Sequence, residues 1–178
     1  MNLVEQLIVE EAQQYIGQQE IKGNMGFKNS WFDKLMRSVG FRDTHAWCVY
    51  FCELVWHGMY KKYDERKLSD IKRIFTGGAV RTFRRFKEDQ EWETSLMPKK
   101  GAIAIWQKWR NGKPTQYGHA AIVVDFSVNE IMTIDGNTDA KGGREGIEVA
   151  EKVRKINYGE TKGLVLKGFI YPQGIEGT

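Results

Sequence analysis

The stretch that decides the fold is residues 98–126, PKKGAIAIWQKWRNGKPTQYGHAAIVVDF. Two short apolar segments rich in β-branched residues, 102–106 and 119–126, lie on either side of a turn-forming run that contains RNGKP. Short segments of this kind, bounded by Gly, Pro and Asn, are typical of strands. The chain changes character at Pro98, and we expect a β-sheet from there onward.

Three later segments are also short and rich in β-branched residues, and polar links that include SVNE and DAKGGREG separate them. They are residues 130–135, 147–156 and 163–172. The six-residue link DFSVNE is short, so the two strands that it joins should form a hairpin. No helical pattern alternates with the strands, as a parallel sheet would require, so we expect an antiparallel sheet.

The sequence before Pro98 has helical spacing. Apolar residues recur on one face of the first twenty residues, which predicts a first helix. We expect further helices at about 31–39, 44–60 and 79–87, and Thr44 is the expected N-cap of the helix at 44–60. Helices followed by an antiparallel sheet define an α+β fold. A chain of 178 residues is one domain by length, so we expect residues 1–178 to form a single domain.

The net charge is +4, and basic residues cluster in RTFRRFK, residues 81–87. The cluster is either a solvated helix face or a surface that attracts a polyanion. No helix-turn-helix, zinc-finger or RNA-binding motif is present, so we expect no nucleic-acid partner. An anionic polymer such as a cell wall is compatible with the charge.

Acidic residues and glutamines interrupt the apolar positions of the first twenty residues. No apolar run approaches the roughly 18 residues that a bilayer requires. We therefore expect synthesis in the cytoplasm without a signal peptide, and no membrane-embedded segment. As a separate expectation, the protein is a monomer.

Both cysteines lie in HAWCVYFCELVW, residues 45–56, on one face of the expected helix. A disulfide between them would need unusual geometry, and a zinc site would lack its second Cys/His pair. The default interpretation for both is a small buried apolar residue. Cys48 differs because it lies near the expected helix N-terminus, where free N–H groups and the helix dipole lower a thiol pKa. We expect Cys52 to lie in the core.

A thiolate nucleophile needs a base, and the chain has three histidines. His45 is expected on the exposed first turn, and His57 lies about 13 Å along the helix from Cys48. His119 opens the strongest expected strand, directly after Gly118, where it is either a rigidly mounted base or simply a polar strand-end residue.

The next strand ends in TIDGNTD. Asp135 and Asn137 share a face by alternation, and either could orient the imidazole of His119. The alternative is that DGN forms a turn, its usual meaning in isolation.

The ordered set AWCVYF, MPKKGAIAIW, YGHAAIVV and TIDGNT resembles the CHAP family, the cysteine, histidine-dependent amidohydrolases/peptidases. These are papain-like peptidoglycan hydrolases of bacteriophage endolysins and bacterial autolysins, and EEAQQYIGQQE…GN extends the resemblance over nearly the whole chain. The resemblance implies a papain-like α+β fold with N-terminal helices packed on a C-terminal antiparallel sheet.

The resemblance also implies residue roles. Cys48 is the nucleophile and contributes its N–H to an oxyanion hole, His119 is the general base, and Asn137 or Asp135 orients it. Trp47 and Trp106 either wall the cleft or pack in the core. Some members bind calcium through acidic residues just before the cysteine, whereas VGFRDTHAW offers only Asp43, so we expect no metal and no cofactor.

The implied activity is hydrolysis of an amide bond in the peptidoglycan peptide or of the muramoyl–L-alanine linkage, after release through a holin or a secretion system. Two alternatives stay open. One is an intracellular papain-like peptidase or amidase acting on a protein or a small molecule, and the other is a non-enzymatic binding domain on the same scaffold.

Overall fold

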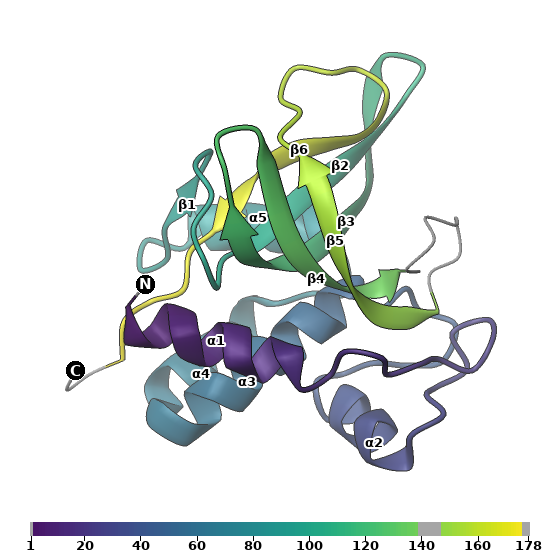
Figure 1. The fold of residues 1–178 in the computed structure, drawn as a ribbon, viewed down its shortest axis with the longest axis vertical. Helices are drawn as coiled ribbons and strands as arrows, with labels where there is room; N and C mark the ends of the chain where they lie inside the picture. Colours follow the sequence, from purple (N-terminus) through teal and green to yellow (C-terminus); the bar gives the residue numbers. More distant parts are fainter. Residues whose placement is uncertain (1, 139–146, 176–178) are drawn as a thin grey trace.

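The computed structural model describes residues 2–138 and 147–175, in which helices precede an antiparallel sheet (Figure 1). The helices are α1 (Leu3–Gln13), α2 (Ser30–Ser38), α3 (Cys48–Tyr63), α4 (Glu65–Ile74) and α5 (Ala79–Glu88). The strands are β1 (Thr94–Ser95), β2 (Ile103–Arg110), β3 (Lys113–Phe126), β4 (Glu130–Thr138), β5 (Glu148–Lys155) and β6 (Gly163–Ile170). The predicted α+β class is confirmed. The predicted link DAKGGREG lies outside the described residues.

The sheet has the strand order β1-β6-β2-β3-β4-β5, and every neighbouring pair is antiparallel. The predicted hairpin across DFSVNE is confirmed, with Phe126 opposite Ile131. The turn in RNGKP is tighter than we predicted, because pairing continues to Arg110 opposite Lys113. The two-residue strand β1, which pairs with β6, was not predicted.

The sheet buries side chains on both faces, because successive residues of a strand point to opposite sides. On the face covered by the helices, Ile105, Ala120 and Ile122 belong to the main core. On the opposite face, Trp106, Val123 and Phe169 belong to a smaller apolar cluster. In Figure 1, α1, α3 and α4 lie below the sheet and α5 lies behind it.

Helix α3 is the centre of the molecule. It is apolar on nearly all sides, as expected for a helix surrounded by other elements. Its Trp56 is fully buried and donates its indole N–H to the carbonyl of Gly101, 3.1 Å away, which ties the helix to the start of β2. Cys52 is fully buried, in agreement with its predicted place in the core, and both cysteines are free thiols.

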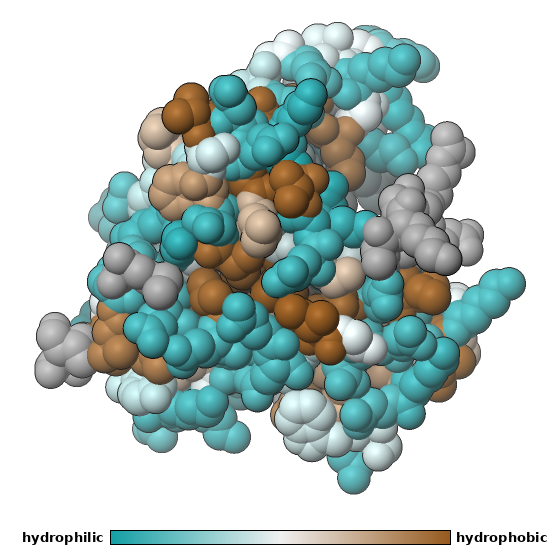
Figure 2. Space-filling view, in the orientation of Figure 1, coloured by the Kyte–Doolittle hydropathy of each residue, from teal (hydrophilic) through white to brown (hydrophobic). Residues whose placement is uncertain are grey.

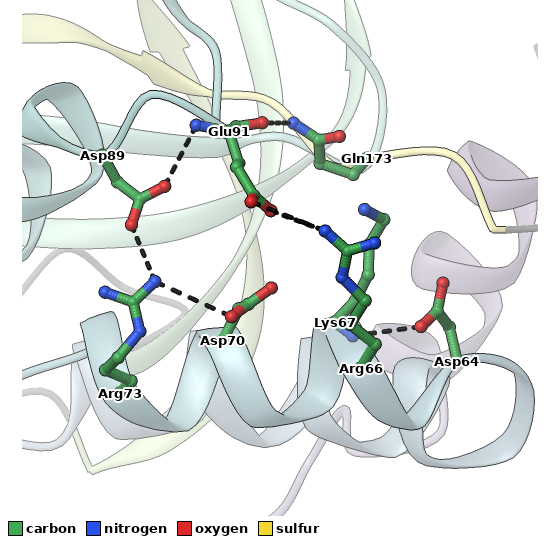
Figure 3. Close-up of polar contacts among 8 residues, drawn as sticks. All are labelled: Asp64, Arg66, Lys67, Asp70, Arg73, Asp89, Glu91 and Gln173. Carbon is green, nitrogen blue, oxygen red and sulfur yellow. Dashed lines mark hydrogen bonds and ion pairs between the residues drawn. The ribbon is translucent and has the colours of Figure 1, made fainter.

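Helix α4 was missed from sequence because its composition is dominated by charge. Asp64 caps it by accepting the N–H of Lys67 at 3.0 Å. Figure 3 shows how its basic side chains reach the segment before β1: Arg73 pairs with Asp89 at 2.8 Å, and Arg66 pairs with Glu91 at 3.4 Å. Polar contacts therefore fix the outer face of α4.

Figure 2 shows that hydrophilic side chains cover most of the face viewed, while hydrophobic groups are visible both over the strands and where the sheet meets the helices. In the part of the chain that the structure describes, no helix has both the length and the apolar character needed to cross a membrane.

Candidate active site

Helix α3 begins at Cys48 itself. The prediction that Thr44 caps this helix is wrong: Thr44 has a φ of 71° and donates its N–H to the carbonyl of Asn24, whereas an N-cap is normally extended. The N-cap is Trp47, and its side chain makes no capping hydrogen bond. The thiol therefore lies on the first helical residue, at the end of the helix where backbone N–H groups lack intrahelical partners.

Trp47 fixes the position of this helix start. Its side chain is fully buried, and its indole N–H donates to a carboxylate oxygen of Glu20 at 2.6 Å. The ring of Phe27 packs edge-on against it at 4.9 Å. Of the two roles considered for Trp47, the structure supports core packing, because so deeply buried a ring presents no surface to a cleft.

The thiol of Cys48 interacts directly with His119. Burial alone would raise the pKa of Cys48. A hydrogen bond with the His119 imidazole, the charge of that ring, and the N–H groups of Ala120 and Val49 together outweigh burial and lower the pKa below its ordinary value. The surroundings of Cys48 thus favour a thiolate.

The imidazole of His119 lies between this thiol and a carboxylate. Its Nε2 is 2.7 Å from Oδ2 of Asp135, which leaves Nδ1 for the thiol. Burial lowers the pKa of His119, but the hydrogen bonds with Asp135 and Cys48 outweigh it and raise the pKa from 6.5 to about 9. The site favours a thiolate and an imidazolium side by side.

Two glycines let the strands that carry His119 and Asp135 lie close to neighbouring elements. A Cβ on Gly118 would lie 2.0 Å from the carbonyl oxygen of Trp106 on the neighbouring strand. A Cβ on Gly136 would lie 2.6 Å from the Cβ of Phe51 on α3. Neither position could hold a side chain without moving backbone or core, so both glycines let the strands of His119 and Asp135 approach their neighbours.

Asp135 is fully buried, and both of its oxygens are occupied. Oδ2 accepts from His119 and from Nη2 of Arg154, and Oδ1 accepts from the hydroxyl of Thr133 at 2.5 Å. Burial raises the pKa of this carboxyl, but its hydrogen bond with His119 and the charges of His119 and Arg154 lower it below the usual range. Asp135 is therefore an ionised carboxylate inside the protein.

Asn137 lies two residues farther along β4 and makes a different local structure. Its φ is 55°, at an irregularity where the register between β4 and β5 shifts. Among the described residues, no hydrogen bond joins its side chain to His119, which Asp135 contacts instead. The run DGN lies inside strand β4, with the irregularity at Asn137, so it forms no separate turn that ends the strand.

The other two histidines lie apart from this group. His45 is exposed, just before the helix, with its Nδ1 3.2 Å from the hydroxyl of Tyr50. His57 is half-buried in the third turn of α3. Asp43, the one acidic residue considered for calcium, pairs with Arg37 at 2.7 Å. The expectation of no metal or cofactor stays a prediction.

Sequence reasoning missed the residues that complete the environment of Asp135. They are Thr133 on the same strand and Arg154 on β5. The guanidinium of Arg154 lies over the ring of Trp106 at 5.0 Å, and that ring is 5.8 Å from the ring of His119. A basic residue in the alternating strand EVAEKVRK gives no signal that separates it from a surface residue, because the contact depends on how the strands associate.

The fold and this geometry together define an α+β protein with a thiol, an imidazole and a carboxylate in contact. The family model of the CHAP domain matches residues 40–137, more than half of the chain, and the chain belongs to the CHAP family. The match includes Cys48, His119, Asp135 and Asn137. Members of this family are amidase and peptidase hydrolases that act on peptidoglycan. No curated protein and no solved structure matches the chain.

Proposed function

We propose that this protein is an endolysin-like peptidoglycan hydrolase that cleaves an amide bond with Cys48 as nucleophile and His119 as base. The bond is one within the wall peptide or the muramoyl–L-alanine linkage. The observation that carries the proposal is the contact of the Cys48 thiol, on the first residue of α3, with an imidazole whose other nitrogen binds Asp135 at 2.7 Å.

The first half of the reaction forms a thioester. The thiolate of Cys48 attacks the amide carbonyl, and the resulting oxyanion is stabilised by N–H groups at the start of α3, among them that of Cys48. His119, protonated in the resting ion pair, donates its proton to the leaving amine. The tetrahedral intermediate then collapses to the thioester.

The second half regenerates the ion pair. His119 is now neutral and accepts a proton from a water molecule, which attacks the thioester carbonyl. The carbon–sulfur bond then breaks, which releases the carboxylic acid product and the Cys48 thiolate beside the reprotonated His119. Asp135 supports both halves, because its charge stabilises the imidazolium when it forms and its oxygen fixes the direction of Nε2. We assign the orienting role to Asp135 in this mechanism, since it is the residue that contacts the ring.

The surface charge supports an anionic wall as substrate. The net charge is +4, and Arg81, Arg84 and Lys87 are exposed on α5. Such a surface attracts a negatively charged polymer at low ionic strength. We propose that the enzyme is made in the cytoplasm and reaches the wall through a holin or a secretion system.

Digestion of purified sacculi tests this function. Wild-type protein should release soluble fragments, and mass spectrometry of the new termini identifies the bond. Cys48→Ala should release none, while Cys52→Ala, the matched change one turn deeper in the same helix, should remain active. Release of fragments by the Cys48→Ala protein at the wild-type rate would refute the proposal.

A further inference from the structure

Arg154 has no part in the reaction just described, yet it shares an oxygen with the imidazole. Its Nη2 donates to Oδ2 of Asp135, the same atom that accepts Nε2 of His119. A guanidinium and an imidazolium thus lie on one carboxylate oxygen. Like charges this close repel, so Arg154 opposes the protonation that Asp135 favours.

The position of Arg154 is determined by contacts on two sides. Its guanidinium packs over the face of Trp106 at 5.0 Å, a favourable arrangement for a cation. Its side chain is 26% exposed, and its Nε is buried without a hydrogen-bond partner among the described residues. Asp135 and Trp106 therefore hold the group, which is no ordinary solvated strand residue.

We propose that Arg154 is a positioning residue: it keeps Asp135 ionised and in place throughout the reaction, and it limits how strongly that carboxylate stabilises the protonated form of His119. This inference rests on the proposed function, because it assigns Arg154 a part in the same chemistry.

The need for a permanent cation follows from the reaction cycle. His119 is charged in the resting enzyme and neutral in the thioester stage, so it cannot serve throughout as the counter-ion of a carboxylate that is fully buried. An arginine stays protonated at every accessible pH. Arg154 therefore supplies the charge that Asp135 lacks whenever His119 gives up its proton.

The second effect concerns proton donation. An imidazolium that a buried carboxylate stabilises too strongly is a poor acid toward the leaving amine. In the part of the chain that the structure describes, the titratable groups that face His119 and Asp135 are Cys48 and Cys52 on α3 and Arg154 on β5. Arg154 is the one permanent cation of this set and so moderates His119.

The test is a nuclear magnetic resonance titration of the imidazoles in nitrogen-15-labelled protein, which needs no substrate. The chain has three histidines, so His119→Ala identifies the signal of interest. We expect the wild-type midpoint of His119 at a pKa of about 9. Arg154→Gln removes the cation and should raise that midpoint by about one unit, the usual effect of one nearby charge.

Three further variants sharpen the result. Arg154→Met is a second neutral variant, measured in the same way, in case the glutamine protein does not fold. Arg154→Lys retains a cation and should leave the midpoint near the wild-type value. Lys155→Met, an exposed neighbour on the same strand, is the matched control and should change nothing. A midpoint that does not move in a folded neutral variant would overturn the role of Arg154.

Digestion of sacculi then separates this inference from the proposed function. In the neutral variants, the rate at neutral pH should fall several-fold and the alkaline limit of activity should move upward with the His119 midpoint. If wild-type protein releases no fragments while the midpoint still moves, the proposed substrate fails and the role of Arg154 stands. If fragments are released and the midpoint is unmoved, the function stands and Arg154 is structural.

Discussion

Replacing Asp135 by asparagine removes the negative charge that His119 and Arg154 share, while the size and shape of the side chain are nearly unchanged. Arg154 can only donate hydrogen bonds, so the amide oxygen of the new residue should take the place of Oδ2, which accepts from both Arg154 and His119. The amide nitrogen then faces the hydroxyl of Thr133, which can accept. His119 keeps its tautomer, and the loss of activity should come from charge alone.

The size of that loss follows from the titration of His119. Its pKa is raised from 6.5 to about 9, which corresponds to about 3 kcal/mol at roughly 1.4 kcal/mol per unit. Because the hydrogen bond with Cys48 contributes to the same shift, we assign about 1.5–3 kcal/mol to Asp135. Asp135→Asn should therefore slow fragment release roughly 10- to 100-fold.

The assay combines fragment release from sacculi with the imidazole titration, in which the His119 midpoint should fall by at least one unit. Asn137→Gly is the control, because Asn137 has a φ of 55° that glycine adopts without strain. It should lose no more than a few-fold. A His119 midpoint that Asp135→Asn leaves unchanged, or a larger loss from Asn137→Gly, would refute the assignment of the orienting role.

Other predictions concern pH and packing. Activity should follow a bell-shaped pH profile. The rising limb, at a pH below the ordinary pKa of a thiol, reports ionisation of Cys48, and the falling limb, near pH 9, reports deprotonation of His119. A profile that keeps rising beyond pH 10 would contradict the ion pair. Burial raises the pKa of Glu53 to about 8, so stability falls as pH rises toward that value. Glu53→Gln should then raise the free energy of unfolding by about 2–4 kcal/mol at pH 8 but not at pH 4, measured in urea. Cys52→Ala should lower the free energy of unfolding by about 1–2 kcal/mol with activity kept. Gly136→Ala should lower it by about 1–3 kcal/mol and reduce activity. A Gly136→Ala protein as stable as the wild type would show that the contact of β4 with α3 is loose.

Much of the fold was predictable because its signals are local. The strands are short, β-branched and bounded by turn residues, and the DFSVNE hairpin needed only the length of its link. The glycines beside His119 and Asp135 are visible in the sequence, but the reason for Gly118, a neighbouring carbonyl oxygen of Trp106 that would lie 2.0 Å from a Cβ, requires the structure. The choice of Cys48 over Cys52 rested on position in the helix, and the structure sharpens that contrast.

The parts that failed depend on contacts between distant segments. The sequence FRDTHAW contains Thr44, a good capping residue. Its backbone N–H instead donates a hydrogen bond to the carbonyl of Asn24, and helix α3 begins four residues later, at Cys48. Helix α4 has the capping Asp64, yet its charged composition concealed it. Arg154 resembles any surface cation until β5 is placed beside β4, so its contact with Asp135 required the structure.

The most direct measurement of the central idea is the ionisation of Cys48, followed through the ultraviolet absorbance of the thiolate across pH. In the wild-type protein the midpoint should lie below that of an ordinary thiol and disappear in Cys48→Ala. In His119→Ala it should rise to an ordinary value or above, because burial is then unopposed by the imidazole. A wild-type midpoint at or above that of a free cysteine, unmoved by loss of His119, would contradict the account.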